Sequence, residues 1–160
     1  MVLALAIGLG LGLAVSPACG CAARTRAGTA AAGAATAAPA TLEEARARPA
    51  RPGLFTGCYD TSFGPMLLLE NTDASVMGSY VHNDGELLGR VEGQALVFRW
   101  REKDTGVTGS GYFLPTASEG GAGGLGGASG VIGRWGYGDS YDDGGGWNGK
   151  KFSSDPAGCR

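Results

Sequence analysis

Residues 76–100 read VMGSYVH, NDG, ELLGRVE, GQ and ALVFRW, which is a run of three patterned segments separated by two short turns. Apolar and polar residues alternate with a period of two in each segment, as is typical of a β-strand with one buried face. Glycine and asparagine accept positive φ at little cost, so NDG and GQ are expected to form tight turns. The stretch therefore predicts a three-stranded antiparallel meander.

Glycine also stands two positions before a large residue at five places along the chain. These pairs are Gly57 with Tyr59, Gly78 with Tyr80, Gly89 with Val91, Gly111 with Phe113, and Gly133 with Trp135. From Gly78 onward the spacings are 11, 22 and 22 residues, which is the rhythm of one strand plus one turn. Glycine weakens a strand unless the sheet bends or another backbone comes close. The pattern therefore favours a strongly coiled sheet.

The same alternation extends over residues 53–160. The predicted strands are Leu54–Thr61, Pro65–Glu70, Val76–His82, Glu86–Glu92, Ala95–Lys103, Val107–Leu114, Val131–Tyr137 and Gly146–Phe152. Two segments rich in glycine, 119–130 and 138–145, are expected to be loops. The predicted fold is all-β, an eight-stranded antiparallel up-and-down barrel, because closure removes the exposed edges of so small a sheet.

The first 23 residues predict a signal peptide with a lipobox-like end. Residues 1–15 are apolar, and they are too few to span a bilayer, which takes about 20 residues. Residues 16–22 resemble a bacterial lipobox, in which small residues precede a cysteine that is lipidated. Either Cys19 or Cys21 is the modified residue. The prediction is a lipoprotein held in the cell envelope by a lipid anchor, and the alternative is a secreted protein.

Residues 24–52 consist mainly of alanine, threonine, arginine, glycine and proline and contain no aromatic residue. Such a composition buries too little apolar surface to offset chain entropy, so a disordered linker is predicted. A helix of about two turns is the alternative. Thr41 would cap it, with Glu44 at the capping-box position and Pro49 after its end.

The two remaining cysteines, Cys58 and Cys159, lie in the first predicted strand and just after the last one. An exported protein meets oxidising conditions, which favour a disulfide. The first and last strands are neighbours in a closed barrel but lie at opposite edges of an open sheet. A bridge between Cys58 and Cys159 is therefore predicted.

Charge and motifs argue against several classes of function. Residues 53–160 carry eight Lys and Arg against thirteen Asp and Glu, so nucleic acid is not an expected partner. One histidine, His82, is present, and no zinc spacing, nucleophile elbow or P-loop occurs. We expect no enzyme, no cofactor and no metal site. The weaker alternatives are a hydrolase using Asp142 or Asp143 with His82, and a Ca²⁺ site in residues 139–143.

The aromatic residues suggest the most specific functional hypotheses. Alternation directs Tyr80, Trp100 and Trp135 toward the barrel interior, together with Tyr59 and Phe63. One hypothesis is a non-enzymatic module that binds a small ligand in an aromatic pocket around the first three residues. The other is a structural or protein-interaction domain whose interior is filled by these rings. A cavity between the three residues would favour the first hypothesis, and indoles packed against each other would favour the second.

The pattern Gly57-x-Tyr59-x-x-x-Phe63-Gly64, followed by Gly78-x-Tyr80, resembles the opening of avidin-type biotin-binding barrels. Trp100 stands where that family has a pocket tryptophan, and Trp135 stands where its seventh strand has a tryptophan. Trp147 and Asp155 match a tryptophan and a polar ligand-binding residue near its end. The resemblance implies an eight-stranded, avidin- or lipocalin-like barrel. A MORN-like hairpin sheet, in which glycine–aromatic units also recur, is the competing resemblance.

The departures from the avidin pattern concern the ligand. Thr61, Pro65 and His82 stand where that family has polar residues that contact the head group of biotin. Loss of several buried polar partners, at about 1–3 kcal/mol each, would abolish tight binding. The resemblance therefore implies the architecture and does not imply biotin.

Overall fold

The computed structural model describes residues 38–117 and 128–159. The predicted signal peptide, Cys19 and Cys21, and most of the predicted 119–130 loop lie outside these residues. The elements are α1 (Leu42–Ala47), β1 (Gly57–Thr61), β2 (Gly64–Glu70), β3 (Ser75–Tyr80), η1 (His82–Asp84), β4 (Gly85–Glu92), β5 (Ala95–Glu102), β6 (Thr108–Thr116), β7 (Gly130–Tyr137), β8 (Gly145–Gly146), β9 (Gly149–Ser153) and η2 (Pro156–Gly158). Within the described ranges, no helix has the length and apolar composition that a membrane span requires.

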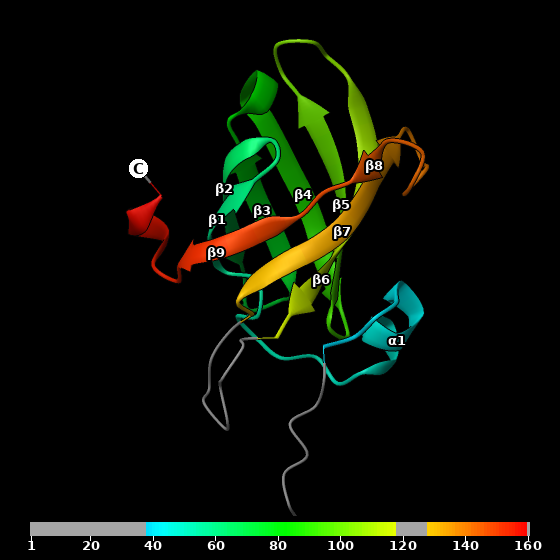
Figure 1. Cartoon of the computed structure of the whole chain (residues 1–160), viewed down its shortest axis with the longest axis vertical. Helices are drawn as coiled ribbons and strands as arrows, with labels where there is room; N and C mark the ends of the chain where they lie inside the picture. The colour runs from blue at the N-terminus through cyan, green and yellow to red at the C-terminus, as the bar shows by residue number, and fades with distance from the viewer. Residues whose placement is uncertain (1–37, 118–127, 160) are drawn as a thin grey trace, which may run out of the picture. The chain divides into compact units, whose positions relative to one another are not determined.

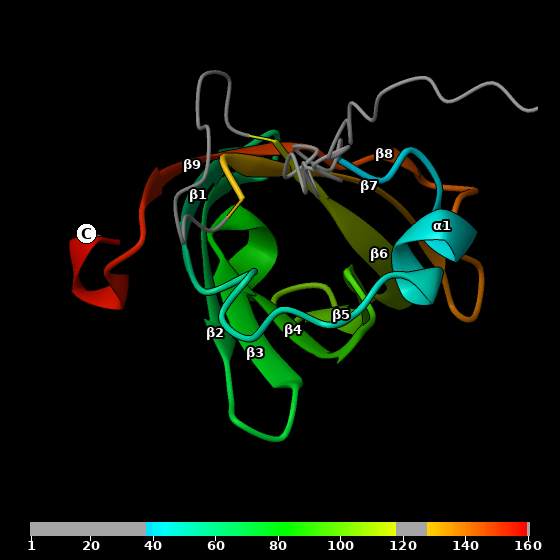
Figure 2. The same cartoon turned by 90° about the horizontal axis from the view of Figure 1, so that it is seen from below.

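The sheet closes into an eight-stranded antiparallel barrel, which confirms the predicted fold (Figure 1). Strands β1 to β6 form a meander, and β7 pairs with β6. Strand β9 then pairs with both β7 and β1 and completes the ring. Figure 2 shows the ring from below, with α1 beside the β5 and β6 side of the barrel.

The closing seam between β7 and β9 is short, and β8 continues it. Two residue pairs join β7 to β9, and two more join β7 to β8, all in one antiparallel register. Between them, Trp147 N–H donates to Gly133 O over 2.9 Å, and Gly133 N–H donates to Asn148 Oδ1 over 3.4 Å. The predicted single strand Gly146–Phe152 is therefore wrong in one detail, because it divides into β8 and β9 at Trp147 and Asn148.

Three other predicted strand boundaries differ by two or three residues, and one of them is the end of β6, which lies at Thr116 rather than Leu114. Strand β1 begins at Gly57 rather than Leu54, and Gly57 has a φ of 144°, which ends regular pairing on that side. Strand β3 ends at Tyr80 rather than His82, because the chain turns there into η1. In that turn Asn83 and Asp84 have φ values of 51° and 47°, so the NDG segment does reverse the chain where predicted.

The core lies inside the ring, on the faces that alternation predicts. Val76 and Tyr80 of β3, Leu87 of β4, and Phe98 and Trp100 of β5 are all buried. Their sequence neighbours face outward, and Met77 and Leu88 are exposed. Burial of apolar surface at about 25 cal/mol per Å² is the main stabilising contribution of such a core.

Inward-facing aromatic rings lie against inward-facing glycines directly across the sheet. These pairs are Tyr80 with Gly85, Phe98 with Gly111, Trp100 with Gly109, and Phe113 with Gly133. A Cβ atom added at any of these glycines would lie less than 3 Å from the ring opposite. The glycines therefore do more than let the sheet coil, because they supply the space that the rings occupy.

The disordered linker predicted for residues 24–52 is wrong around α1. Thr41 Oγ1 accepts a hydrogen bond from Glu44 N–H over 3.1 Å, which is the N-cap of the alternative helix. Ala45 is buried in a small outer cluster with Ala95 and Leu114. Its carbonyl accepts a hydrogen bond from Gln94 N–H in the β4–β5 turn. The helix therefore forms because it docks on the barrel.

The predicted disulfide between Cys58 and Cys159 is present, with a Cα–Cα distance of 5.3 Å. Cys58 is fully buried on β1, and η2 lies beside β1 and β2. The bridge thus ties the C-terminal segment after β9 to the first strand of the ring, across a sequence separation of 101 residues.

Replacement of Gly111 by alanine should destabilise the barrel. The new Cβ would lie 2.7 Å from Phe98 Cζ and 2.8 Å from Arg134 O. Crowding of this kind costs about 1–3 kcal/mol, so we expect the free energy of unfolding to fall by that amount. The control is Gly146→Ala, whose Cβ meets only Gly133 O at 4.0 Å. Urea unfolding followed by tryptophan fluorescence measures both, and equal stability of the two variants would contradict the packing argument.

Loss of the disulfide should also be measurable. Cys159→Ser opens a loop of 101 residues, and we expect the free energy of unfolding to fall by about 2–4 kcal/mol. The reduced wild-type protein should match the variant in the same urea experiment. If Cys159→Ser is as stable as the oxidised wild type, the bridge does not constrain the unfolded chain as argued.

Candidate functional site

The three predicted site residues meet at one end of the barrel, here called the mouth. It is formed by the β1–β2 turn, the ends of β3, β5 and β7, and the segment after β8. Tyr80, Trp100 and Trp135 line a single recess there. Sequence reasoning placed Phe63 on the interior side, and Phe63 also lines the recess. The structure thus brings these residues together, and their role in ligand binding stays a prediction.

Trp147 is the residue of this group whose direction the sequence did not predict. It lies between β8 and β9, is 2% exposed, and its ring stands 4.9 Å from the ring centres of both Phe63 and Tyr80. Phe98 and Phe113 contact its ring from deeper in the barrel. Glycines flank the segment around Trp147, so alternation gave no inward direction for it.

The rings at the mouth pack edge to face. Trp100 and Trp135 have ring centres 5.5 Å apart and an interplanar angle of 78°. Phe63 and Trp135 are 5.7 Å apart at 86°. Such geometry stabilises an aromatic pair by about 0.5–1.5 kcal/mol beyond area burial. The indoles therefore pack against each other, which is the arrangement expected of a filled barrel.

The space that remains between the rings is small. The recess has a volume of about 20 Å³ and is bordered by Phe63, Tyr80, Trp100, Trp135 and Trp147, together with Glu102. A cavity of about 10–15 Å³ already holds one water molecule. The recess therefore accommodates one group of that size and does not enclose a whole small molecule.

Glu102 is a site residue that sequence reasoning missed. It ends β5 two positions after Trp100, so alternation does place it on the inward face. Its side chain is 14% exposed. Oε2 accepts hydrogen bonds from Asn83 Nδ2 over 2.7 Å and Thr105 Oγ1 over 2.9 Å. Oε1 lies 3.8 Å from His82 Nε2, which is beyond hydrogen-bond distance.

Two indole N–H groups at the mouth lack hydrogen-bond partners. Trp100 Nε1 and Trp147 Nε1 are both buried, and neither has an acceptor among the described residues. A buried donor without a partner costs about 1–3 kcal/mol. Native proteins contain few such groups, so each one calls for an explanation.

Burial is the main cause of the raised pKa values of the two interior tyrosines, Tyr59 and Tyr80. Removal from solvent raises the pKa of Tyr80, and the negative charge of Glu102 raises it further. Burial also raises the pKa of Tyr59, with a smaller contribution from Glu70. Tyr59 O–H donates to Phe55 O over 2.7 Å, so its proton is fixed by a hydrogen bond. Both side chains stay neutral at physiological pH.

The structure does not bring His82 together with Asp142 or Asp143, as the hydrolase hypothesis would require. The side chain of His82 is half exposed at the rim and contacts Phe63 and Glu102 rather than Asp142 or Asp143. Asp143 Oδ1 accepts a hydrogen bond from Tyr137 N–H over 2.9 Å. Across residues 38–117 and 128–159, no three His, Cys, Asp or Glu side chains gather as metal ligands would.

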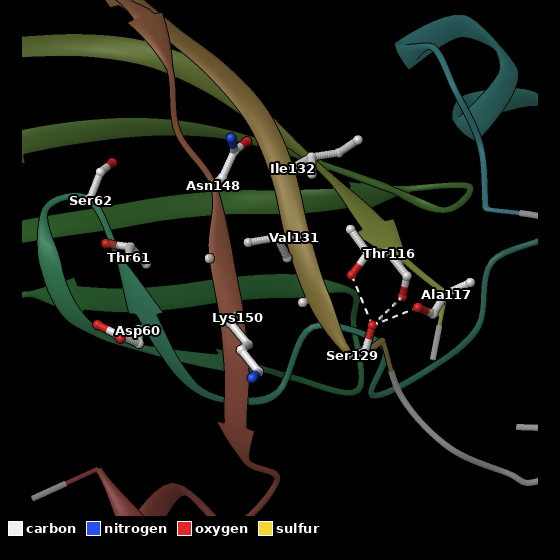
Figure 3. Close-up of a pocket in the computed structure, with 12 residues that line it drawn as sticks. Asp60, Thr61, Ser62, Thr116, Ala117, Ser129, Val131, Ile132, Asn148 and Lys150 are labelled. Atoms are coloured by element: carbon white, nitrogen blue, oxygen red, sulfur yellow. Dashed lines mark hydrogen bonds between the residues drawn. The ribbon is translucent and has the colours of Figure 1, made fainter. Parts of the chain in front are cut away.

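A second hollow of about 700 Å³ lies along the strands β1, β9 and β7 and the end of β6 (Figure 3). Two of its hydroxyl groups already have hydrogen-bond partners. Ser129 Oγ lies 3.0 Å from Thr116 Oγ1 and also donates to the carbonyl oxygen of Ala117 over 2.7 Å. Ala117 directly precedes residues 118–127, which lie outside the described ranges, and Ser129 follows two positions after them. We assign no function to this hollow.

Comparison with protein-family models, with curated proteins and with solved structures finds no match. No family is therefore assigned to the chain, and the avidin-type resemblance stays a prediction drawn from the sequence pattern.

The raised tyrosine pKa values predict a loss of stability in alkali. The unfolded chain ionises tyrosine near pH 10, whereas the folded chain holds Tyr59 and Tyr80 neutral to higher pH. The contribution of these two tyrosines to the free energy of unfolding should therefore be constant below about pH 10 and fall above it. Tyr80→Phe should make this fall shallower, and the exposed control Tyr137→Phe should not. Urea unfolding at pH 8, 10 and 11 measures the slopes, and identical slopes for both variants would contradict the assignment.

Proposed function

We propose that the chain is an exported bacterial lipoprotein, anchored through Cys19 or Cys21, whose folded part is a non-enzymatic β-barrel with a filled interior. In this proposal the barrel is a structural or protein-interaction domain of the cell envelope. The observation that carries it is the edge-to-face packing of Trp100 and Trp135, which leaves a recess of only about 20 Å³. A barrel filled in this way acts through its surface.

Other features support the export and the interaction role. The bridge between Cys58 and Cys159 suits an oxidising compartment. Met77 and Leu88 form an outward-facing cross-strand pair, and both side chains are about half exposed or more. Exposed apolar residues that stand together are typical of contact surfaces. The excess of acidic over basic residues speaks against nucleic acid as the partner.

Binding of a small molecule at the mouth is the second candidate function. It is supported by polar groups that a purely apolar core would not need. The indole N–H groups of Trp100 and Trp147 have no acceptor among the described residues, and Glu102 Oε1 faces only the His82 Nε2 atom at 3.8 Å. Such binding would take place at the recess and on its rim, since the barrel does not enclose a ligand.

The anchor is tested by growth of a bacterial expression host in labelled palmitate. We expect label on the wild-type chain and on one of the variants Cys19→Ser and Cys21→Ser, with none on the other. Both variants keep Cys58 and Cys159, so the fold is the same in each arm. Label on neither the wild type nor the variants would overturn the lipoprotein proposal and leave the secreted alternative.

A further inference from the structure

We propose that the outer face of β3 and β4 binds the same face of a second copy of this chain. The inference rests on the proposed role as a protein-interaction domain, and it names the partner. Three observations carry it: the apolar side chains on this face, the order of the charges along β4, and the position of α1.

The centre of this face is a row of apolar side chains that crosses three strands. Leu69 of β2 pairs with Met77 of β3, and Met77 pairs with Leu88 of β4. All three point outward, because the residue before each of them is buried in the core. Met77 is 49% exposed and Leu88 is 64% exposed. Apolar surface in a continuous row is stabilised when another surface covers it.

The charges on either side of this row are arranged so that the face complements itself. The outward positions of β4 are Glu86, Leu88 and Arg90, and all three are exposed. At about 3.3 Å per residue, the two charged residues lie about 13 Å apart with Leu88 midway between them. A second copy can be turned by half a turn about an axis that lies in the contact plane, level with Leu88 and at right angles to β4. Glu86 of each copy then lies opposite Arg90 of the other, as in an isologous interface.

Both charged groups are available for such a pairing. Arg90 takes part in no hydrogen bond or salt bridge among residues 38–117 and 128–159. Glu86 Oε1 lies 2.8 Å from Lys103 Nζ, and Lys103 also pairs with Asp84 over 3.3 Å. Because an ionised carboxylate accepts several hydrogen bonds, Glu86 can hold Lys103 and a second cation together.

The neighbouring strands bring no strong repulsion into the contact. The outward positions of β3 beside the apolar row are Ser75 and Ser79, which are uncharged. Arg99 of β5 stands next to Leu88 in the same row and would face its own copy. Its guanidinium already pairs with Asp139 over 2.6 Å, which offsets its charge. The wall of the barrel also curves away at β5, so the contact is centred on β3 and β4 (Figure 2).

The position of α1 agrees with this arrangement. The rotation exchanges the two ends of the barrels, but it keeps the order of the strands along the axis. Helix α1 contacts β5 and β6 in each copy, so both helices lie on the same side of the dimer (Figure 2). The described chain reaches the barrel through α1. In the proposed lipoprotein, both anchors can therefore reach one membrane surface.

Other occupants match this face less well. A partner of uniform positive charge would attract Glu86 but repel Arg90, and a partner of uniform negative charge would do the reverse. An anionic lipid surface would meet the same conflict at Glu86. A second copy presents an apolar centre with one charge of each sign, in the order that the face requires. Two convex barrels touch over a limited area, so the dimer should be weak, with a dissociation constant in the micromolar range.

The test is sedimentation equilibrium of the full chain in detergent micelles at micromolar concentrations, with protein made in labelled palmitate. We expect the wild type to form a dimer. Glu86→Arg and Arg90→Glu each place like charges opposite one another at both ends of the contact. Each variant alone should therefore raise the dissociation constant of the dimer by about tenfold.

The two variants also rescue each other in this arrangement. In an equimolar mixture, the chain with two cations on β4 faces the chain with two anions, so the dimer should re-form about as tightly as in the wild type. The double variant Glu86→Arg with Arg90→Glu should do the same, and it keeps the test open if one single variant does not fold. The matched control is Lys150→Glu, a reversal of an exposed charge on β9, and it should dimerise as the wild type does.

A wild type that stays monomeric would overturn the second copy as the partner. The palmitate label on the same sample still decides the lipoprotein proposal, so the two failures can be told apart. Dimers that neither single variant weakens would place the contact on another surface and overturn the inference. Loss in both variants without recovery in the mixture or the double variant would overturn the pairing of Glu86 with Arg90, as would an equal loss in Lys150→Glu.

Discussion

The contact of aromatic rings with glycines across the sheet is the constraint on which the interior depends. Eight strands enclose only enough room for packed side chains. Large rings such as those of Phe98 and Trp100 fit because Gly111 and Gly109 stand opposite them and contribute no side chain. Glycine weakens a strand by itself, but a ring that covers it restores buried apolar area and shields the backbone. The four glycines that face core rings and the aromatic core are thus one feature of the sequence.

Closure of the ring depends on the same packing. The seam between β7 and β9 has only two residue pairs, so the backbone hydrogen bonds there are few. Trp147 directly follows β8. Its side chain turns inward at this point and contacts the rings of Phe63, Tyr80, Phe98 and Phe113. The disulfide then holds the end of the chain to β1. Side-chain packing and one covalent bond thus compensate for a short ladder.

The parts that sequence reasoning predicted are those with a repeated local signal. Alternation gave the eight strands and the inward direction of Tyr80 and Trp100, and the positions of the two cysteines predicted the bridge of a closed ring. Helix α1 was set aside because its stability comes from docking, and Ala45 and Gln94, which hold it, show no pattern. Glu102 was missed because a polar residue at the end of a strand usually lies at the rim in solvent. Its partners Asn83 and Thr105 come from turns, whose geometry alternation does not describe.

The mouth also shows what the aromatic packing of the core costs. Rings that pack edge to face exclude a ligand from the interior, because each ring occupies the space that a ligand would need. The same core buries the indole N–H groups of Trp100 and Trp147 without an acceptor among the described residues, whereas Glu102 accepts hydrogen bonds from Asn83 and Thr105. A fully apolar core of this size would avoid the cost of burying those groups. Packing of the Trp100 and Trp147 rings against their neighbours therefore has to offset the cost of the two unpaired N–H groups.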